Sequence, residues 1–397
     1  MFIDEVLESH LSVTCPQIHS ARLQAVMDVA TGLLKSRNLS LTAMGRQLSS
    51  DTAIKHRIKK VDRLLSNQHL YNEVTSIYEG LSGYVVKYIN QSKELPLIVD
   101  LCYMKDNHSV QMLSAEIALK GRSLPIYRDV FEENQLKKRA PDFIEGLSRC
   151  IPEGREVIVI MDAGFGEDWF DAIADNGWYW LVRARGKKFI KLSEADDWVD
   201  ARELYDLATP RTKQYHSAFI TKKTPRACRV VIKSSSTKNT GRKRPKTLPR
   251  NYNAANGNYK RIAAEPWVLA TNLPDKYTAI QVVNYYKKRM QIEQSFRDLK
   301  SHQFGLSARY IRTVTIYRWA IAMLLAAIVQ VTLWIIGVIG HHQNMQTYFQ
   351  ANTIKDRKQF SYFYLGQLIV QHHKVDDVMK ACKDISQAIT QELQRDW

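Results

Sequence analysis

An apolar run from Trp319 to Gly340 is the feature that most constrains how this chain can fold, because only Gln330 and Thr332 interrupt it. A helix of about 20 apolar residues is long enough to span a bilayer. The centre of a large domain also requires a helix that is apolar all round. Arg318 before the run and His341 after it could flank a membrane span. The chain has no second run of this kind and no signal peptide, which favours a buried core helix.

The charge of the chain is unbalanced. Its 397 residues allow two or three domains with a large core. Lys and Arg number 57 against 40 Asp and Glu, a net charge of +17. Such an excess favours a polyanionic partner, either nucleic acid or an acidic membrane surface. The five cysteines are scattered without a Cys-x-x-Cys pair, which argues against a disulfide framework or a zinc ribbon and fits a reducing cytoplasm.

Most of the excess charge lies in one segment. From Leu207 to Ala264 there are fifteen Lys or Arg and no acidic residue. The centre of this segment, with Arg242, Lys243 and Arg244, is rich in Ser, Thr, Gly and Pro and predicts a basic loop. A loop that follows a phosphate backbone and a generic basic patch are both compatible with this composition. Residues 215–221 and 227–233 predict strands, so the sequence favours a small basic β insertion at 187–264.

The first 75 residues predict a separate helical domain. Residues 41–48 and 52–65 predict two helices joined by a short turn. The second helix has an apolar side, and the rest of its surface carries Lys55, Arg57, Lys59, Lys60 and Arg63. This arrangement is similar to a helix-turn-helix with a basic second helix that reads DNA. An ordinary basic amphipathic helix is the alternative.

From about residue 93 the pattern changes to strands. Strands are predicted at 95–100, 110–119, 123–131, 156–161, 178–183 and 267–271, with helices at 134–150 and 168–175. This order predicts an α/β (α+β) fold with a mixed sheet flanked by helices. Two apolar strands are each predicted to end in a carboxylate, Asp100 and Asp162. Two carboxylates held at one sheet edge repel each other unless a cation joins them, so the pair predicts Mg²⁺.

The segment from Lys276 to Lys300 predicts one continuous helix, because neither Pro nor Gly interrupts it. At about 100° per residue, its side chains Tyr286, Arg289, Glu293 and Lys300 project within about 60° of one another. One interpretation is a solvated face on which Glu293 pairs with a neighbouring arginine. The other is a functional stripe, in which Glu293 supplies a third carboxylate, enough for two metal ions about 4 Å apart.

These motifs together resemble the DDE transposases of bacterial insertion sequences. The resemblance rests on Asp100, on the Asp162-Ala163-Gly164-Phe165 motif and on the spacing Tyr286-x₂-Arg289-x₃-Glu293-x₆-Lys300. That spacing is the Tyr-Arg-Glu-Lys signature of the IS-four family. Residues 101–103, which follow the first aspartate, add nothing to the match.

The resemblance implies an RNase H-like core in two parts, 90–186 and 265–345, separated by the basic insertion and followed by a helical C-terminal region at 346–397. It also places the apolar helix inside this core. It implies that Asp100, Asp162 and Glu293 ligate two Mg²⁺ ions, for which Mn²⁺ substitutes. It implies that Tyr286, Arg289 and Lys300 hold phosphates of the transposon end. Trp267 falls where the family keeps a tryptophan that receives a flipped base, which needs an aromatic platform; a core strand residue is the alternative.

The expected activity is cut-and-paste DNA transposition. The protein would bind terminal inverted repeats, cleave the DNA through a hairpin intermediate and join the 3′-hydroxyl to target DNA. Double-stranded DNA and a second subunit are the expected partners, with no membrane, and the expected location is the cytoplasm, at the nucleoid. The alternatives are an RNase H-like nuclease without strand transfer, a catalytically silent DNA-binding derivative of a transposase and, least favoured, a membrane protein.

Overall fold

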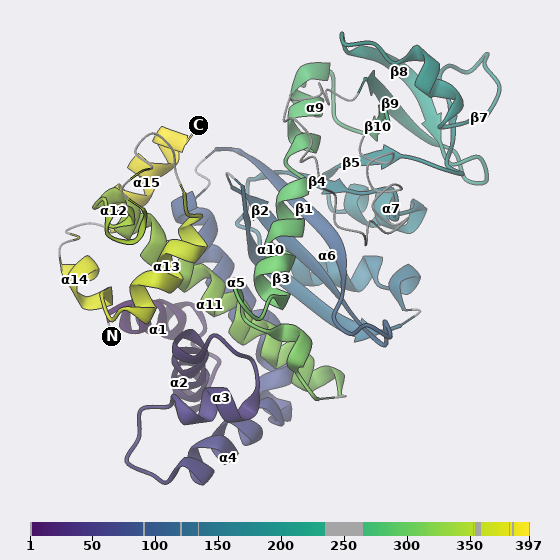
Figure 1. Cartoon of the computed structure of the whole chain (residues 1–397). Coiled ribbons are helices and arrows are strands. Elements are labelled where there is room, and N and C mark those ends of the chain that lie inside the picture. Colours follow the sequence, from purple (N-terminus) through teal and green to yellow (C-terminus); the bar gives the residue numbers. More distant parts are fainter. Residues whose placement is uncertain are drawn as a thin grey trace, which may run out of the picture. The chain divides into compact units, whose positions relative to one another are not determined.

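The computed structural model describes residues 2–89, 92–119, 121–133, 135–234, 265–313, 315–351, 353, 359–380, 382 and 385–396 (Figure 1). The chain divides into two compact units. The first unit contains Met1–Val157 and Met290–Trp397, and the second contains Ile158–Arg289. The boundary between Arg289 and Met290 therefore falls inside the segment from Tyr286 to Lys300, which carries the Tyr-Arg-Glu-Lys signature.

The N-terminal part of the first unit is helical. Its helices are α1 (Phe2–Thr14), α2 (Ser20–Ser36), α3 (Leu41–Arg46), α4 (Ile54–Leu65) and α5 (Gln68–Ile89). Helices α3 and α4 confirm the two predicted helices, with shorter bounds. Ser40 caps α3, since its side chain accepts a hydrogen bond from the Ala43 amide. The predicted start of the next helix is two residues early, because Ala53 is extended and α4 begins after it.

Helix α11 (Ile316–His342) contains the apolar run and lies in the core of the first unit. It packs against α2, α4, α5 and β3 and against the C-terminal helices α13, α14 and α15. Among the described residues it is the one helix long and apolar enough to cross a membrane, and its apolar stretch is wholly buried inside the structure. Its two polar interruptions have partners, since Gln330 accepts from Arg128 at 2.7 Å and Thr332 donates to the Ile328 carbonyl at 2.9 Å. The prediction of a core helix is confirmed.

The C-terminal region is helical, as predicted. Its helices are α12 (Gln346–Phe349), α13 (Tyr362–Gln371), α14 (Val375–Lys380) and α15 (Ile385–Asp396). Helix α13 lies closest to α11, because two glycines remove the side chains that would separate the helices. A Cβ added at Gly337 would collide with the Tyr362 carbonyl, and one at Gly366 with the Leu333 carbonyl.

Three antiparallel strands of the first unit pair in the order β3-β2-β1. They are β1 (Glu94–Tyr103), β2 (Val110–Ala118) and β3 (Ser123–Glu132), followed by a 3₁₀ turn at Leu136–Lys138 and by α6 (Ala140–Arg149), which is shorter than the predicted helix. Helix α10 (Met290–Lys300) contacts all three strands and lies across them in Figure 1. The sheet therefore supports the helix that carries Glu293.

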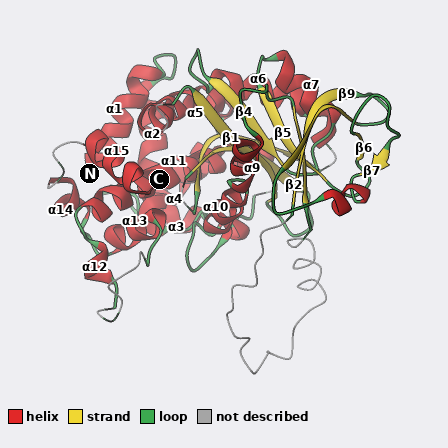
Figure 2. Cartoon of the chain, turned by 90° about the horizontal axis from the view of Figure 1, so that it is seen from above, coloured by secondary structure: helices red, strands yellow, loops and turns green. Residues whose placement is uncertain are grey.

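The strands of the second unit pair in the order β4-β5-β10-β9-β8-β6-β7, which mixes parallel and antiparallel neighbours. They are among the strands drawn in yellow in Figure 2. Strand β4 (Glu156–Met161), whose first two residues belong to the first unit, is parallel to β5 (Tyr179–Ala184) and joined to it through α7 (Glu167–Asp175). The other strands are antiparallel: β10 (Trp267–Thr271), β9 (Arg226–Lys233), β8 (Lys213–Ile220), β6 (Phe189–Lys191) and β7 (Val199–Asp200). The mixed sheet with flanking helices confirms the predicted α/β class.

The two strands predicted in the basic segment, β8 and β9, are present. They pair with each other, and β9 pairs with β10, so these strands extend the sheet of the second unit. Residues 235–264 lie outside the described residues. The predicted DNA-contacting residues Arg242, Lys243 and Arg244 are among them.

The prediction of one continuous helix from Lys276 to Lys300 is wrong. The structure has α9 (Ala279–Lys287) and, after a turn at Lys288 and Arg289, α10. The Lys288 and Arg289 amides bond to carbonyls three residues back, those of Tyr285 and Tyr286, which tightens and ends α9. Nothing in the local sequence marks this break, because it involves neither Pro nor Gly. Tyr286 and Arg289 thus precede a new helix that carries Glu293 and Lys300.

We expect the close packing of α11 on α13 to make Gly337 intolerant of a side chain. Gly337→Ala should lower the free energy of unfolding by about 1–3 kcal/mol, because the methyl group forces backbone apart. Gly83→Ala in α5 is the matched control, since a Cβ there meets nothing within 4 Å. It should raise stability by about 0.4–1 kcal/mol. Urea unfolding measures both, and equal effects of the two substitutions would contradict the packing described.

Candidate active site

Asp100 lies inside β1, and the prediction that it ends its strand is wrong. The strand continues through Cys102 to Tyr103, because these residues keep pairing with Met112 and Gln111 of β2. Asp100 itself is opposite Ser114, is half-buried, and its Oδ1 accepts a hydrogen bond from the Leu101 amide at 2.9 Å. A carboxylate in mid-strand is held by backbone on both sides.

Glu293 and Lys300 share one face of α10, because seven residues correspond to almost two helical turns. Lys300 lies near the thiol of Cys102, which is 2% exposed, and acts on its pKa. Burial raises the pKa of this thiol, Lys300 and Arg128 oppose the rise, and the Asp100 carboxylate adds to it. Lys300 and Asp100 therefore both lie within electrostatic range of Cys102. The period-two alternation of a strand, which puts Asp100 and Cys102 on one face, is the signal that could have identified this residue.

Asp162 directly follows the buried strand β4, as predicted. Its Oδ1 accepts a hydrogen bond from the Gly164 amide at 2.7 Å. A Cβ at Gly164 would lie 3.0 Å from that oxygen, so glycine gives the turn its room. The next residue, Phe165, is buried against the edge of Trp169, with ring centroids 4.8 Å apart. The Asp-Ala-Gly-Phe motif is therefore a tight turn that fixes the Asp162 carboxylate at the end of a strand.

Lys188, which sequence reasoning missed, supports this turn. Its ammonium donates to the Phe165 carbonyl and lies 5.5 Å from the centre of the Phe170 ring. Burial lowers the pKa of Lys188 to about 8, and the nearby carboxylates of Asp162 and Glu167 oppose the shift. Lys188 is thus a positive charge beside Asp162 that the sequence pattern does not mark.

Tyr286, Arg289 and Trp267 lie together in the second unit. The Tyr286 ring is 5% exposed and meets the Trp267 ring edge-on, with centroids 5.2 Å apart. Burial raises the pKa of Tyr286, while a hydrogen bond with Arg289 and the charge of Arg183 lower it, and Asp162 raises it further. Tyr286 therefore lies within electrostatic range of both Arg289 and Asp162.

Trp267 is half-buried and packs against the apolar cluster formed by β4, β5, β9, β10 and α9. It thus has a core contact and keeps part of its ring exposed. The sequence analysis also did not identify Arg183. Its side chain donates hydrogen bonds to the carbonyls of Glu265 and Pro266, just before β10, at 3.4 and 3.3 Å.

Each of the three predicted carboxylates is, by its chemistry, a ligand for a divalent cation. Asp100 and Glu293 belong to the first unit and Asp162 to the second, and all three are half-buried. Carboxylate oxygens are the ligands that Mg²⁺ and other hard cations prefer. Within the described residues of the two units, no group of three His, Cys, Asp or Glu side chains gathers as a metal cluster.

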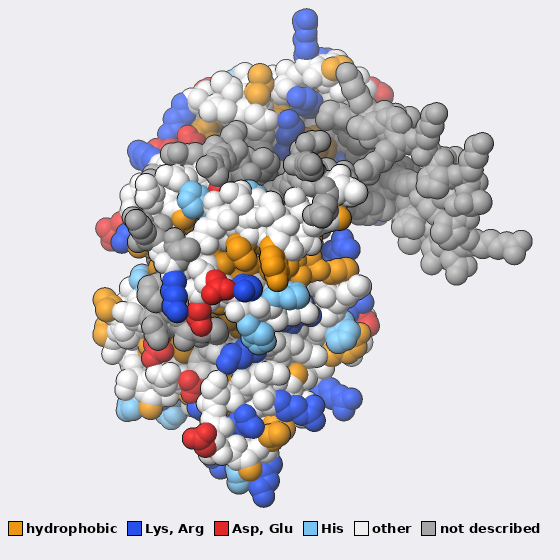
Figure 3. Space-filling model, turned by 60° about the vertical axis from the view of Figure 1, so that its left-hand side comes forward, with side chains coloured by type: hydrophobic (Ala, Val, Ile, Leu, Met, Phe, Trp, Pro, Cys, Tyr) orange, Lys and Arg blue, Asp and Glu red, His pale blue; other side chains and the backbone are white. Residues whose placement is uncertain are grey.

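The basic residues of α4 do not share one environment. Lys55, Lys59, Lys60 and Arg63 are exposed, and Lys60 pairs with Asp28 at 2.5 Å. Arg57 is half-buried and donates to the Leu48 carbonyl at 2.8 Å, which ties α4 to the end of α3. Figure 3 shows Lys and Arg side chains gathered at the lower end of its face, the end at which Figure 1 places α4.

Helix α4 is anchored at its other end by the core helix. The Arg318 guanidinium of α11 pairs with Asp62 at 2.6 Å and hydrogen-bonds Ser66. The connection between α3 and α4, Gln47 to Ala53, is longer than the turn of about three or four residues that a helix-turn-helix uses. The structure thus holds α4 firmly while its exposed lysines and Arg63 remain accessible.

The chain matches a known protein family. Residues 104–329, more than half of the sequence, match the family described as Transposase DDE domain. The matched segment includes Asp162, Glu293 and the whole Tyr-Arg-Glu-Lys segment, and it begins just after Asp100. No curated protein matches the chain.

Arg57 and Lys59 should behave differently on substitution. Arg57→Ala should lower the free energy of unfolding by about 1.5–3 kcal/mol, because a buried carbonyl loses its charged donor. Lys59→Ala should change stability by less than about 0.5 kcal/mol. It should instead weaken binding to DNA of any sequence. The slope of log binding constant against log salt concentration should fall in magnitude by about 1, as expected for the loss of one phosphate contact. Urea unfolding and fluorescence anisotropy at several salt concentrations separate the two effects, and a reversed pattern would refute them.

The depressed pKa of Lys188 makes stability depend on pH. Because the folded pKa of about 8 lies below that of an unfolded lysine, the unfolded chain binds more protons between pH 8 and about 10.5. Stability therefore rises with pH in that window. Relative to Lys188→Met, the wild-type protein should gain about 1–2 kcal/mol between pH 7.5 and 9.5, measured by urea unfolding. Parallel pH profiles of the two proteins would show that Lys188 is not buried as described.

Proposed function

The chain belongs to the DDE transposase family, whose members cleave and join DNA and use divalent metal ions, and we propose that it is a cut-and-paste transposase. Within that family we assign it to the IS-four group, with greatest similarity to the transposon-ten transposase. The observation that carries this assignment is the spacing of Tyr286, Arg289, Glu293 and Lys300. A nuclease without strand transfer needs the three carboxylates but not these three further side chains at fixed spacing.

We propose that Asp100, Asp162 and Glu293 hold two Mg²⁺ ions, with Mn²⁺ as a substitute. The ions would supply an activated water or 3′-hydroxyl and would neutralise charge on the leaving oxygen. The chain itself fixes the carboxylates: Asp100 within a paired strand, Asp162 in a tight turn and Glu293 on α10. Because cleavage, hairpin formation and joining are all in-line phosphoryl transfers, the same residues can serve each in turn.

The cations of the segment have distinct roles in this proposal. Arg289 binds a phosphate of the transposon end. Tyr286 orients the Arg289 guanidinium and holds the phosphate together with it. Lys300, which like Asp100 lies within electrostatic range of Cys102, binds a second phosphate as a point charge. The exposed part of the Trp267 ring receives the base that leaves the stack when the hairpin forms.

DNA binding outside the catalytic residues is assigned to two regions. The helical residues 1–75 would read the terminal inverted repeats through Lys55, Lys59, Lys60 and Arg63. Arg57 would hold α4 in place through its hydrogen bond to the Leu48 carbonyl. Arg242, Lys243 and Arg244 of the basic segment would add phosphate contacts. We propose that two subunits assemble on two DNA ends, in the cytoplasm at the nucleoid. The apolar stretch of α11 is buried inside the structure.

The decisive assay combines the purified protein, Mg²⁺ and DNA that carries the ends of its own element. Hairpin-ended and joined products should form. Glu293→Gln should reduce them at least about 10³-fold, because it removes one metal ligand while it keeps the shape of the side chain. Asp168→Asn, an exposed carboxylate on α7, is the matched control and should keep activity. DNA degraded without joining would leave a nuclease, and binding alone would leave a silent derivative. Inverted repeats on both sides of the coding sequence are the simplest supporting observation.

Arg289 and Lys300 should matter for the transposon end more than for DNA in general. Arg289→Ala and Lys300→Ala should weaken end-complex assembly or hairpin formation about tenfold or more, because each loses a charge-assisted phosphate contact. Arg297→Ala, an exposed arginine of α10, is the control and should have little effect. Gel-shift assays on end DNA and random DNA make the comparison. Equal losses on both DNAs would contradict these roles.

A further inference from the structure

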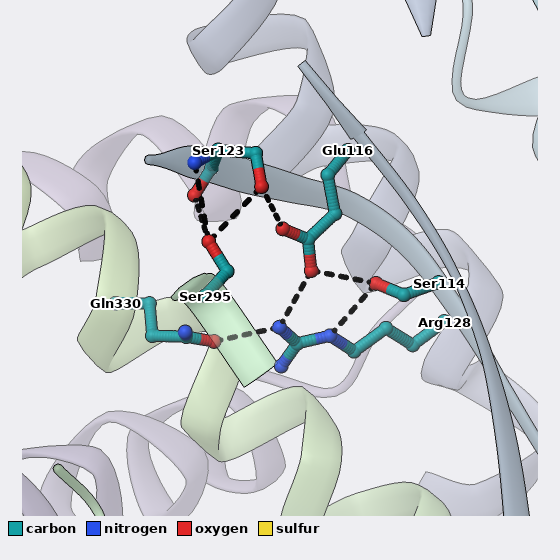
Figure 4. A network of polar contacts seen from close by, with 6 residues as sticks. All are labelled: Ser114, Glu116, Ser123, Arg128, Ser295 and Gln330. Carbon is teal, nitrogen blue, oxygen red and sulfur yellow. Dashed lines mark hydrogen bonds and ion pairs between the residues drawn. The ribbon is translucent and has the colours of Figure 1, made fainter. Parts of the chain in front are cut away.

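A buried polar network connects α10 to the sheet of the first unit (Figure 4). We call it the α10 anchor. It consists of six side chains from β2, β3, α10 and α11, which are Ser114, Glu116, Ser123, Arg128, Ser295 and Gln330, and each of them is buried. No residue of the anchor belongs to the proposed catalytic set.

The centre of the anchor is an ion pair that is shut off from solvent. Glu116 and Arg128 have fully buried side chains, and Arg128 Nη2 lies 3.1 Å from Glu116 Oε1. Arg128 also donates from Nη2 to Gln330 of α11 at 2.7 Å and from Nε to Ser114 at 3.2 Å. A buried ion pair adds little net stability, because both charges lose their hydration. Its presence here therefore calls for a reason other than stability.

The anchor reaches α10 through two serines. The Ser123 hydroxyl donates to Glu116 Oε2 at 2.6 Å. Ser295 of α10 donates to the Ser123 carbonyl at 2.7 Å and accepts from the Ser123 amide at 3.1 Å. One turn further along α10, Asp298 pairs with Arg122 at 2.5 Å. Two consecutive turns of α10 are thus bonded to the start of β3.

These hydrogen bonds fix the rotation and the position of α10 along its axis, which apolar contacts alone do not determine. Ile292, Phe296 and Leu299 bury the apolar side of α10, but such contacts have no direction and tolerate sliding. A slip by one residue would turn the helix by about 100° and shift it by about 1.5 Å. Glu293 lies two residues before Ser295, about 160° around the helix. The Ser295 bonds therefore determine where the Glu293 carboxylate points.

We propose that the α10 anchor is a positioning device that holds Glu293 in the orientation required to ligate a metal ion, with Ser295 as its contact to the catalytic helix. This inference rests on the proposed role of Glu293. It adds that the buried Glu116–Arg128 pair is kept for the register of α10, and that Ser295 acts through Glu293 without touching metal or DNA.

The test measures Mn²⁺ binding to the full-length chain by electron paramagnetic resonance, alongside thermal unfolding. Ser295→Ala should weaken Mn²⁺ binding about tenfold, an effect taken from the low end of the losses caused by removing a residue that orients a metal ligand. A second variant replaces the ion pair with apolar residues, Glu116→Leu together with Arg128→Met. It should keep the unfolding temperature, because such replacements are often neutral, and should also weaken Mn²⁺ binding. Thr332→Val is the control, because it removes a buried hydroxyl of α11 whose bond among the described residues is to the Ile328 carbonyl of its own helix.

The outcomes are distinct. Weaker Mn²⁺ binding in both anchor variants, with binding retained in Thr332→Val, supports the proposal. Binding within twofold of wild type in a folded Ser295→Ala protein overturns it, provided that Glu293→Gln does weaken binding. If Glu293→Gln binds Mn²⁺ like wild type, the ligand assignment itself is wrong, and the anchor loses its purpose with it. A loss of binding in Thr332→Val equal to that in Ser295→Ala would reduce the anchor to a general stabilising role.

Discussion

The burial of α11 is the constraint on which the first unit depends. A helix that is apolar on every side gains stability only if other elements cover its whole circumference. Helices from the N-terminal region, β3 and helices from the C-terminal region supply that cover. The two ends of the sequence therefore share one core. The same helix supplies Arg318, which holds the basic helix α4, and Gln330, which meets Arg128.

A polar network within an apolar core is costly and therefore informative. Unpaired buried groups would destabilise the fold, so the anchor has to be nearly complete. Its members bond in a chain from α11 through β3 to α10, and α10 carries Glu293 and Lys300. In the second unit, buried neighbours hold Asp162 in its turn and Arg289 at Tyr286. In each unit, side chains that touch no substrate hold the ones proposed to do so.

The order of apolar and polar residues along the chain was enough to predict the elements that form from their own sequence. These were the apolar strand that precedes Asp162, the strand at Trp267 and the apolar helix. Features that depend on tertiary contacts were not predicted. The turn at Arg289 has no Pro or Gly to mark it, and β1 continues past Asp100 because β2 offers it further partners. Lys188 is an ordinary residue in sequence, and only folding brings it to the Asp162 turn. Cys102 is marked only by its place two residues after Asp100, and folding brings it near Lys300.

The central claim is that Asp100, Asp162 and Glu293 jointly hold divalent cations. It is tested most directly by replacing Mg²⁺ with Fe²⁺ in the presence of ascorbate and peroxide, which generates radicals that cut the backbone beside the bound ion. The account predicts cuts close to residues 100, 162 and 293, all suppressed together by excess Mg²⁺. Cuts that miss one of the three positions, or that persist in excess Mg²⁺, would contradict it.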